Sequence, residues 1–137
     1  MQPSPAMKKY FPSRRVWLRT LVLLGGLFYT FTGAGLLFAP EWFFSNVGTF
    51  PPFNRHYMGD LGSFLLPLGV GLLIATRDPL RHRSLILVTA IGSLLHAINH
   101  VYDAILLGAE ITHWLTNTLP LLIYGIALTF VVIERRR

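Results

Sequence analysis

Four long apolar segments dominate this chain of 137 residues. A segment of about 20 residues is long enough to cross the hydrocarbon core of a bilayer, because an α-helix rises about 1.5 Å per residue. The segments that reach this length are residues 16–38, 56–75, 84–107 and 114–133. They predict an all-α integral membrane protein in which four spans form a four-helix bundle.

The composition agrees with this interpretation. Hydrophobic residues make up 53% of the chain and charged residues 13%, whereas soluble domains carry about 25% charged residues. The net charge of +6 does not indicate a nucleic-acid partner, because the charges lie between the apolar segments and not along one polar face. The chain has no cysteine, which excludes disulfides, Fe–S clusters and cysteine-ligated zinc.

The distribution of basic residues predicts the orientation in the membrane. Eleven of the twelve Lys and Arg residues lie in residues 8–19, 77–83 and 135–137. In a chain with four spans these three stretches are on the same side, and the positive-inside rule places that side in the cytoplasm. We therefore expect cytoplasmic termini, a basic N-terminal segment at 1–15 and a single four-span domain at 16–137.

The longer outer connection, residues 39–55, is rich in aromatic residues. They are Trp42, Phe43, Phe44, Phe50 and Phe53. Because aromatic side chains favour the level of the lipid headgroups, we expect this loop to rest on the bilayer surface or to cap the bundle.

One face of the third segment is polar. At 100° per residue, offsets of 0, 3, 4 and 7 fall within an arc of about 100°. The residues at these offsets are His96, Asn99, His100 and Asp103, and the stripe extends back through Ser93 and Thr89. Since lipid does not accept such a face, we expect it to point into the bundle.

The second and fourth segments carry residues that are expected to join this face. His56 and Asp60 share one face of the second segment, and Arg55 precedes them. The second segment starts and the third ends on the outer side, so both polar sets are predicted near the outer leaflet. Arg55 is expected to pair with a carboxylate of the cluster or to hold an anionic headgroup. Asn117 and Tyr124, seven residues apart, are expected to face the cluster from the fourth segment.

The spacing of His96 and His100 suits a metal ion held from one helix, as in HExxH zinc sites. The sequence here is HAINH, so the general-base glutamate of that motif is absent. Asp60 and Asp103 would complete a ligand set for Zn²⁺, Fe²⁺ or Mn²⁺. A haem is disfavoured, because its two histidines must face each other at equal depth and His56 is about one turn higher than His100.

Three interpretations of the cluster stay open at this point. It is a metal site, a site for proton handling or for a quinone- or lipid-like polar group, or a hydrogen-bond network that only fixes helix packing. The alternative function is a non-catalytic accessory subunit of a larger respiratory or photosynthetic membrane complex. Glycine-rich helix faces are suited to docking such a partner or a second copy of the chain. No catalytic residue is identified.

Two motifs carry a family resemblance. GDLGSFLLPLGVGLL covers residues 59–73, and HAINHVYD covers residues 96–103. With the glycine-rich first segment, they resemble uncharacterised four-helix bacterial membrane proteins near the DoxX group, over residues 20–130. The resemblance implies a four-helix fold in a bacterial inner membrane. Some DoxX-like proteins are associated with quinone-linked oxidoreductase assemblies, which would favour the accessory-subunit role.

Overall fold

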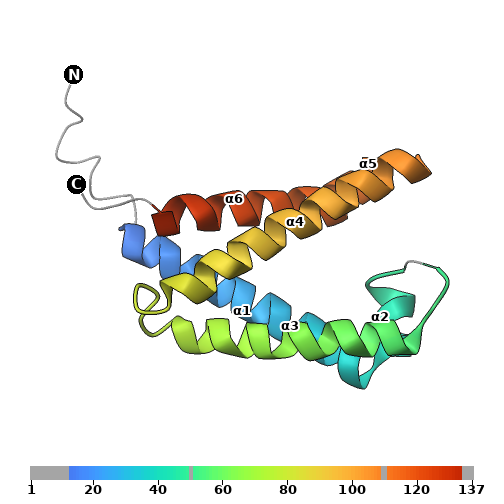
Figure 1. The fold of residues 1–137 in the computed structure, drawn as a ribbon, viewed down its shortest axis with the longest axis horizontal. Coiled ribbons are helices and arrows are strands. Elements are labelled where there is room, and N and C mark those ends of the chain that lie inside the picture. Colours follow the sequence, from blue (N-terminus) through green and yellow to red (C-terminus); the bar gives the residue numbers. More distant parts are fainter. Residues whose placement is uncertain (1–12, 50, 109–110, 134–137) are drawn as a thin grey trace. The chain divides into compact units, whose positions relative to one another are not determined.

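The computed structural model describes residues 13–49, 51–108 and 111–133, and this part of the chain is helical without any strand (Figure 1). Four helical segments are long and apolar enough to cross a membrane. They are α1 (Arg14–Phe38), α3 (Arg55–Ala75), α4 (Arg83–Leu107) and the stretch Trp114–Ile133. The all-α class and the four predicted apolar segments are confirmed, with bounds that differ by at most two residues.

Local sequence explains several helix ends. At the start of α3, the side chain of Asn54 accepts a hydrogen bond from the backbone N–H of Tyr57, at 3.2 Å. This satisfies one of the amides that a helix N-terminus leaves without a partner. Helix α4 ends at Gly108, which has φ 63°. Glycine adopts this left-handed conformation without steric cost.

The aromatic connection contains a helix that the sequence analysis did not predict, α2 (Pro40–Asn46). Pro40 occupies its first turn, where a missing N–H costs nothing. Phe43 is buried, and its ring lies where a Cβ on Gly35 would be, with Cδ2 only 2.5 Å from that position. The absence of a side chain at Gly35 therefore lets α2 pack on the end of α1.

The fourth span is not a continuous α-helix. After α5 (Ile111–His113), residues Trp114–Thr118 form a π-helix, η2, and α6 (Leu119–Ile133) follows. Pro120 is the second residue of α6 and has no N–H to donate to the preceding turn. The wider π turn therefore stands where the regular α-helical hydrogen-bond pattern is interrupted.

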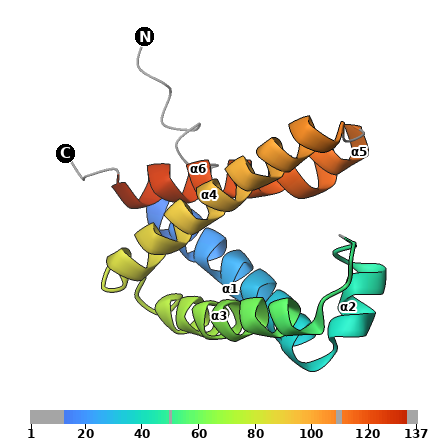
Figure 2. The same cartoon turned by 45° about the vertical axis from the view of Figure 1, so that its right-hand side comes forward.

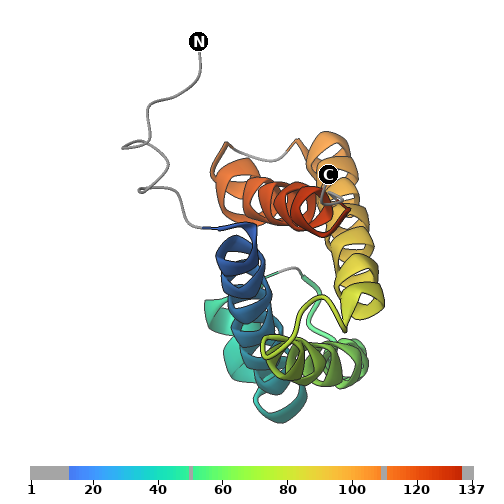
Figure 3. The same ribbon diagram turned by 90° about the vertical axis from the view of Figure 1, so that its left-hand side faces the viewer.

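The chain divides into two compact units. One contains residues 22–78, with α2, α3 and most of α1; the other contains the remaining described residues, with α4, η2 and α6. In the second of these, α4 and α6 lie side by side in all three views (Figures 1, 2 and 3). The predicted single domain over residues 16–137 stays a prediction.

Small residues let α1 and α3 approach each other closely. A Cβ on Gly33 would overlap the backbone of Leu66, whose Cα would be 2.6 Å away. A Cβ on Gly69 would overlap the backbone of Thr30. Backbone-to-backbone packing of this kind is typical of membrane helices, which have no hydrophobic effect to hold them together.

Helix α4 packs on α6, and the buried residues of α4 form one narrow face. On α4 this face consists of Ile86, Thr89, Ala90, Ser93, Ala97 and Ala104. Apart from the adjacent pair Thr89 and Ala90, its members are three, four or seven residues apart, as expected for one face of a helix. On α6 the buried residues are Gly125, Leu128 and Val132. We refer to the α4 residues below as the α4 packing face.

Arg14 ties the start of α1 to the end of α6. Its Nε and Nη2 atoms donate to the backbone carbonyl of Val131, at 2.9 and 2.6 Å. This carbonyl belongs to the last turn of α6, where carbonyls lack helical partners and a positive charge is favourable. Within this unit, the beginning of α1 and the end of α6 are therefore at the same end.

Replacing Arg14 with alanine is expected to lower the free energy of unfolding by about 1 kcal/mol, because a charge-assisted hydrogen bond in a partly buried position is lost. SDS-induced unfolding of the detergent-solubilised protein measures this change. Arg15→Ala is the matched control, because Arg15 is exposed. Equal losses in both variants would contradict a specific role of the Val131 contact.

Candidate functional site

The predicted polar residues of α4 lie beside its packing face. His96 and Asn99 are exposed, and His100 and Asp103 are half-buried. His100 follows Ala97 by three residues and precedes Ala104 by four, so it is on the edge of the packing face. We call His96, Asn99 and Asp103 the α4 polar face.

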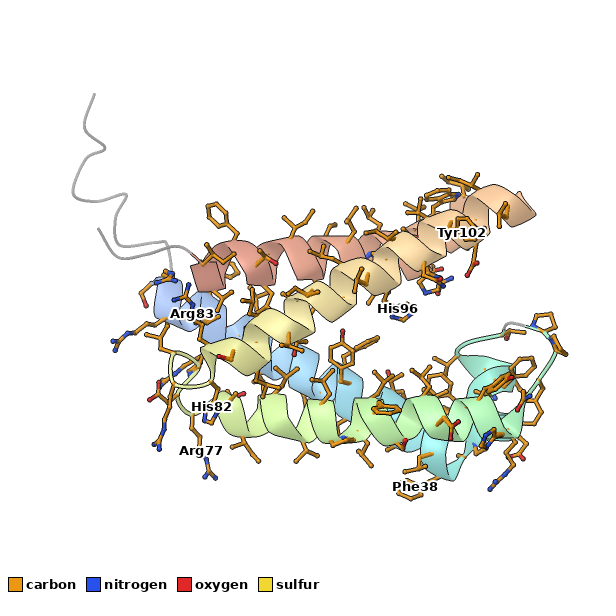
Figure 4. All side chains as sticks on the ribbon, in the orientation of Figure 1. Phe38, Arg77, His82, Arg83, His96 and Tyr102 are labelled. Carbon is orange, nitrogen blue, oxygen red and sulfur yellow. The ribbon has the colours of Figure 1, made fainter. Side chains whose placement is uncertain are left out.

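These residues are paired along the helix. The imidazole rings of His96 and His100 are stacked, with centroids 4.7 Å apart and planes inclined by 25°. The side-chain amide of Asn99 donates to Oδ2 of Asp103, at 3.1 Å. Figure 4 shows the position of His96 on α4. The predicted polar stripe is therefore organised as two i,i+4 pairs, which are neighbours on the helix surface.

The stripe does not continue as an open face toward the N-terminus of α4. Ser93 and Thr89 are buried in the packing face, with exposures of 0% and 1%. Their hydroxyls donate to the carbonyls of Thr89 and Leu85, at 2.8 and 2.9 Å. The polar face is thus accessible only in the C-terminal part of α4, which suits a binding site better than a path across the membrane.

Helix η2 contacts α4 and contains a buried polar residue, Thr118, that was not predicted from the sequence. Thr118 is buried, with 3% exposure, and its hydroxyl has no hydrogen-bond partner within the described part of the chain. Other helical hydroxyls donate to the carbonyl four residues earlier, as in Thr76, Thr89, Ser93, Thr116 and Thr129. Thr116 lies in the same π turn and still donates to the carbonyl of Thr112, so the π turn alone does not explain the unpartnered hydroxyl of Thr118. Asn117 and Tyr124, both predicted to face the cluster, are half-buried on η2 and α6.

The second predicted set lies in the other unit, at the start of α3. His56 Nε2 is 3.4 Å from Asp60 Oδ2, and both side chains are exposed. Arg55 Nε is 3.9 Å from Glu41 Oε1 on α2. Arg55 was expected to pair with a carboxylate of the polar cluster or to hold an anionic headgroup, and its neighbour Glu41 was not among the expected partners. An ion pair between exposed groups contributes little stability.

No three His, Asp or Glu side chains gather into a potential metal site within the described ranges. The two histidines of α4 and the His56–Asp60 pair belong to different units. The predicted four-residue metal set, formed by Asp60, His96, His100 and Asp103, therefore stays a prediction.

The chain matches the model of a known protein family. The model of a family of unknown function, DUF6632, matches residues 13–136. No curated protein and no solved structure matches the chain. Nothing in these comparisons links the chain to DoxX-like proteins, so that resemblance stays a prediction. Because the match covers nearly its whole length, the chain belongs to the DUF6632 family.

Proposed function

We propose that this chain is a membrane protein that binds a quinone- or lipid-like polar group at the α4 polar face. The observation that carries the proposal is that α4 is apolar enough to span a membrane, yet its packing on α6 leaves His96 and Asn99 exposed. Polar side chains in hydrocarbon cost several kcal/mol when they lack partners. A bound polar group would supply those partners.

The three side chains offer both donors and acceptors. A neutral His96 has one N–H and one acceptor nitrogen, and Asn99 keeps its amide oxygen available while its nitrogen holds Asp103. Asp103 has a second carboxylate oxygen. This set can bind a hydroxyl, a carbonyl or an amine, which are the polar groups of membrane amphiphiles.

We place this site in the outer leaflet of a bacterial inner membrane, in a four-helix bundle with cytoplasmic termini. Asp103 is four residues, or about 6 Å, from the end of α4 at Leu107. The Arg14–Val131 contact supports a common side for both termini. The positive-inside rule supports the cytoplasm as that side.

Cysteine labelling tests this orientation without background, because the chain has no cysteine. A membrane-impermeant maleimide is expected to label Thr49→Cys in intact cells and Leu80→Cys only after the membrane is opened. Thr49 follows α2, and Leu80 lies between α3 and α4. Both residues are exposed. The reverse labelling pattern would overturn the orientation.

A divalent metal is a second candidate, favoured by the stacked pair His96 and His100. Two imidazoles from one helix would bind Zn²⁺, Fe²⁺ or Mn²⁺ once a further ligand joined them. The accessory-subunit alternative is tested separately, since it requires a stoichiometric partner after gentle solubilisation.

The binding experiment uses protein purified in mild detergent without chelator. Native mass spectrometry, lipid extraction and elemental analysis are expected to find about one bound amphiphile and no stoichiometric metal. His96→Ala is expected to reduce its occupancy at least about tenfold, which corresponds to about 1.4 kcal/mol. His82→Ala is the control, because His82 precedes α4 and its side chain makes no capping hydrogen bond.

Each other outcome has a definite meaning. If the parent protein contains stoichiometric metal and His96→Ala loses it, the site binds a metal and not an amphiphile. A parent protein that retains neither amphiphile nor metal would contradict a binding function for the α4 polar face.

A further inference from the structure

We infer that the group bound at the α4 polar face carries an ammonium, from an amine-bearing lipid headgroup or a free amphiphilic amine. The inference rests on the proposed binding site and specifies its ligand. It starts from Asp103, whose carboxylate lies in the C-terminal part of a membrane-spanning helix.

The position of Asp103 on α4 disfavours a second anion. The C-terminus of a helix has a partial negative charge, which cations stabilise. The last turn of α4 contains no basic residue. The carboxylate charge of an ionised Asp103 therefore adds to the partial negative charge of the helix C-terminus. A bound cation would interact favourably with both charges.

Among the described residues of this unit, no arginine is paired with Asp103. Its hydrogen-bond partner is the neutral amide of Asn99. Arg14 donates to the carbonyl of Val131, at the opposite end of the α4–α6 pair, where Arg83 begins α4 and Arg81 precedes it. Arg15 and Arg19 belong to the first turns of α1, which Arg14 begins. In the other unit, the guanidinium of Arg55 is close to Glu41.

An ammonium matches the acceptors that this face presents. It has three N–H donors and no acceptor. Asp103 offers a free carboxylate oxygen, Asn99 offers its amide oxygen, and neutral His96 offers one ring nitrogen. A head whose only charge is a phosphate or a carboxylate would instead be repelled by Asp103. Charge complementarity thus favours an amine over an anionic or uncharged headgroup.

Competition between lipids tests this inference. The purified protein is mixed with equal amounts of ethanolamine, choline and glycerol phospholipids of the same chain length, and bound lipid is measured by native mass spectrometry. We expect the ethanolamine lipid to be retained at least about fivefold over the glycerol lipid. A separate titration with dodecylamine, without added lipid, shows whether a free amine is sufficient.

Two substitutions test whether the carboxylate of Asp103 causes the preference for the ethanolamine lipid. Asp103→Asn keeps the side-chain size and an oxygen that accepts from Asn99, and it is expected to abolish the preference for ethanolamine. Asp103→Glu keeps the charge and is expected to preserve it. Asp78→Asn is the control for charge alone, because Asp78 is exposed in the connection between α3 and α4.

The failure of this inference is distinguishable from failure of the proposed function. Equal retention of all three lipids, or a preference for the glycerol lipid, overturns the inference. If the lipid that the parent protein retains is lost in His96→Ala, the α4 polar face still binds a lipid, but not through an ammonium. If the parent retains neither lipid nor dodecylamine, both proposals fail.

Discussion

Replacing Gly33 with leucine is expected to prevent stable packing of α1 on α3. The new Cβ would overlap the backbone nitrogen of Leu66 and lie 2.6 Å from its Cα. Backbone atoms cannot move aside as a side chain can, so the two helices must separate along this contact. Overpacking costs about 1–3 kcal/mol and sometimes more, and we expect at least about 3 kcal/mol here. SDS-induced unfolding and the yield of monodisperse protein measure the loss.

Gly92→Leu is the matched control for this substitution. Gly92 is also in the middle of a spanning helix, α4, but apart from its chain neighbours and the nearby backbone of α4 no atom of the described residues lies within 4 Å of its Cβ position. We expect Gly92→Leu to leave the unfolding free energy within about 0.5 kcal/mol of the parent value. Similar losses in both variants would show that leucine disturbs either helix for reasons unrelated to the α1–α3 contact.

The spans and most of their ends were predictable from the sequence, because they depend on local properties. Segment length and hydropathy determine which residues can cross a bilayer. The end of α1 before Pro40 and the end of α4 at Gly108 follow from the backbone restrictions of proline and glycine. These signals do not depend on what the helix packs against.

Helix α2 and η2 were not predicted, because tertiary contacts decide them. Phe43 appears in the sequence as one of several aromatic residues that could lie at the headgroup level. The structure buries its ring beside Gly35, a contact that no local pattern reports. A π turn likewise differs from an α turn only in its hydrogen-bond register, and Pro120 indicates only that some irregularity is expected.

The candidate site was predictable in part. Helical periodicity correctly grouped His96, Asn99 and Asp103 on one side of α4. It also assigned Ser93 and Thr89 to the same polar stripe, whereas both lie in the packing face. Their hydroxyls bond to carbonyls of α4 itself and so behave there as small, satisfied side chains. Periodicity defines a face, but it does not determine where packing ends and the open site begins.

Gly125→Leu is expected to disturb the packing of α4 on α6, at a cost of about 2 kcal/mol. A Cβ on Gly125 would lie 2.8 Å from Cγ and Cδ2 of Leu94 and 3.3 Å from its backbone nitrogen. The severe overlap is therefore with a side chain, in contrast to Gly33. The same unfolding measurement gives the cost.

Because Leu94 causes the overlap, its truncation should restore packing. In the double variant Gly125→Leu, Leu94→Ala, the overlapping atoms Cγ and Cδ2 are absent, and the remaining 3.3 Å contact needs only a small shift. We expect the two substitutions to be non-additive by at least about 1 kcal/mol, as is typical of residues in direct contact. Purely additive losses would mean that leucine at 125 acts through something other than Leu94.

The rescue also tests whether the α4 polar face depends on this packing. Leu94 is two residues before His96, so a change in how α4 lies on α6 moves the polar face with it. Ligand occupancy is expected to fall in Gly125→Leu and to recover in the double variant, although neither substitution removes a polar group. Occupancy that follows stability in this way would support a site held in place by the α4–α6 contact. If occupancy stayed unchanged while stability fell, the ligand would have to be bound elsewhere.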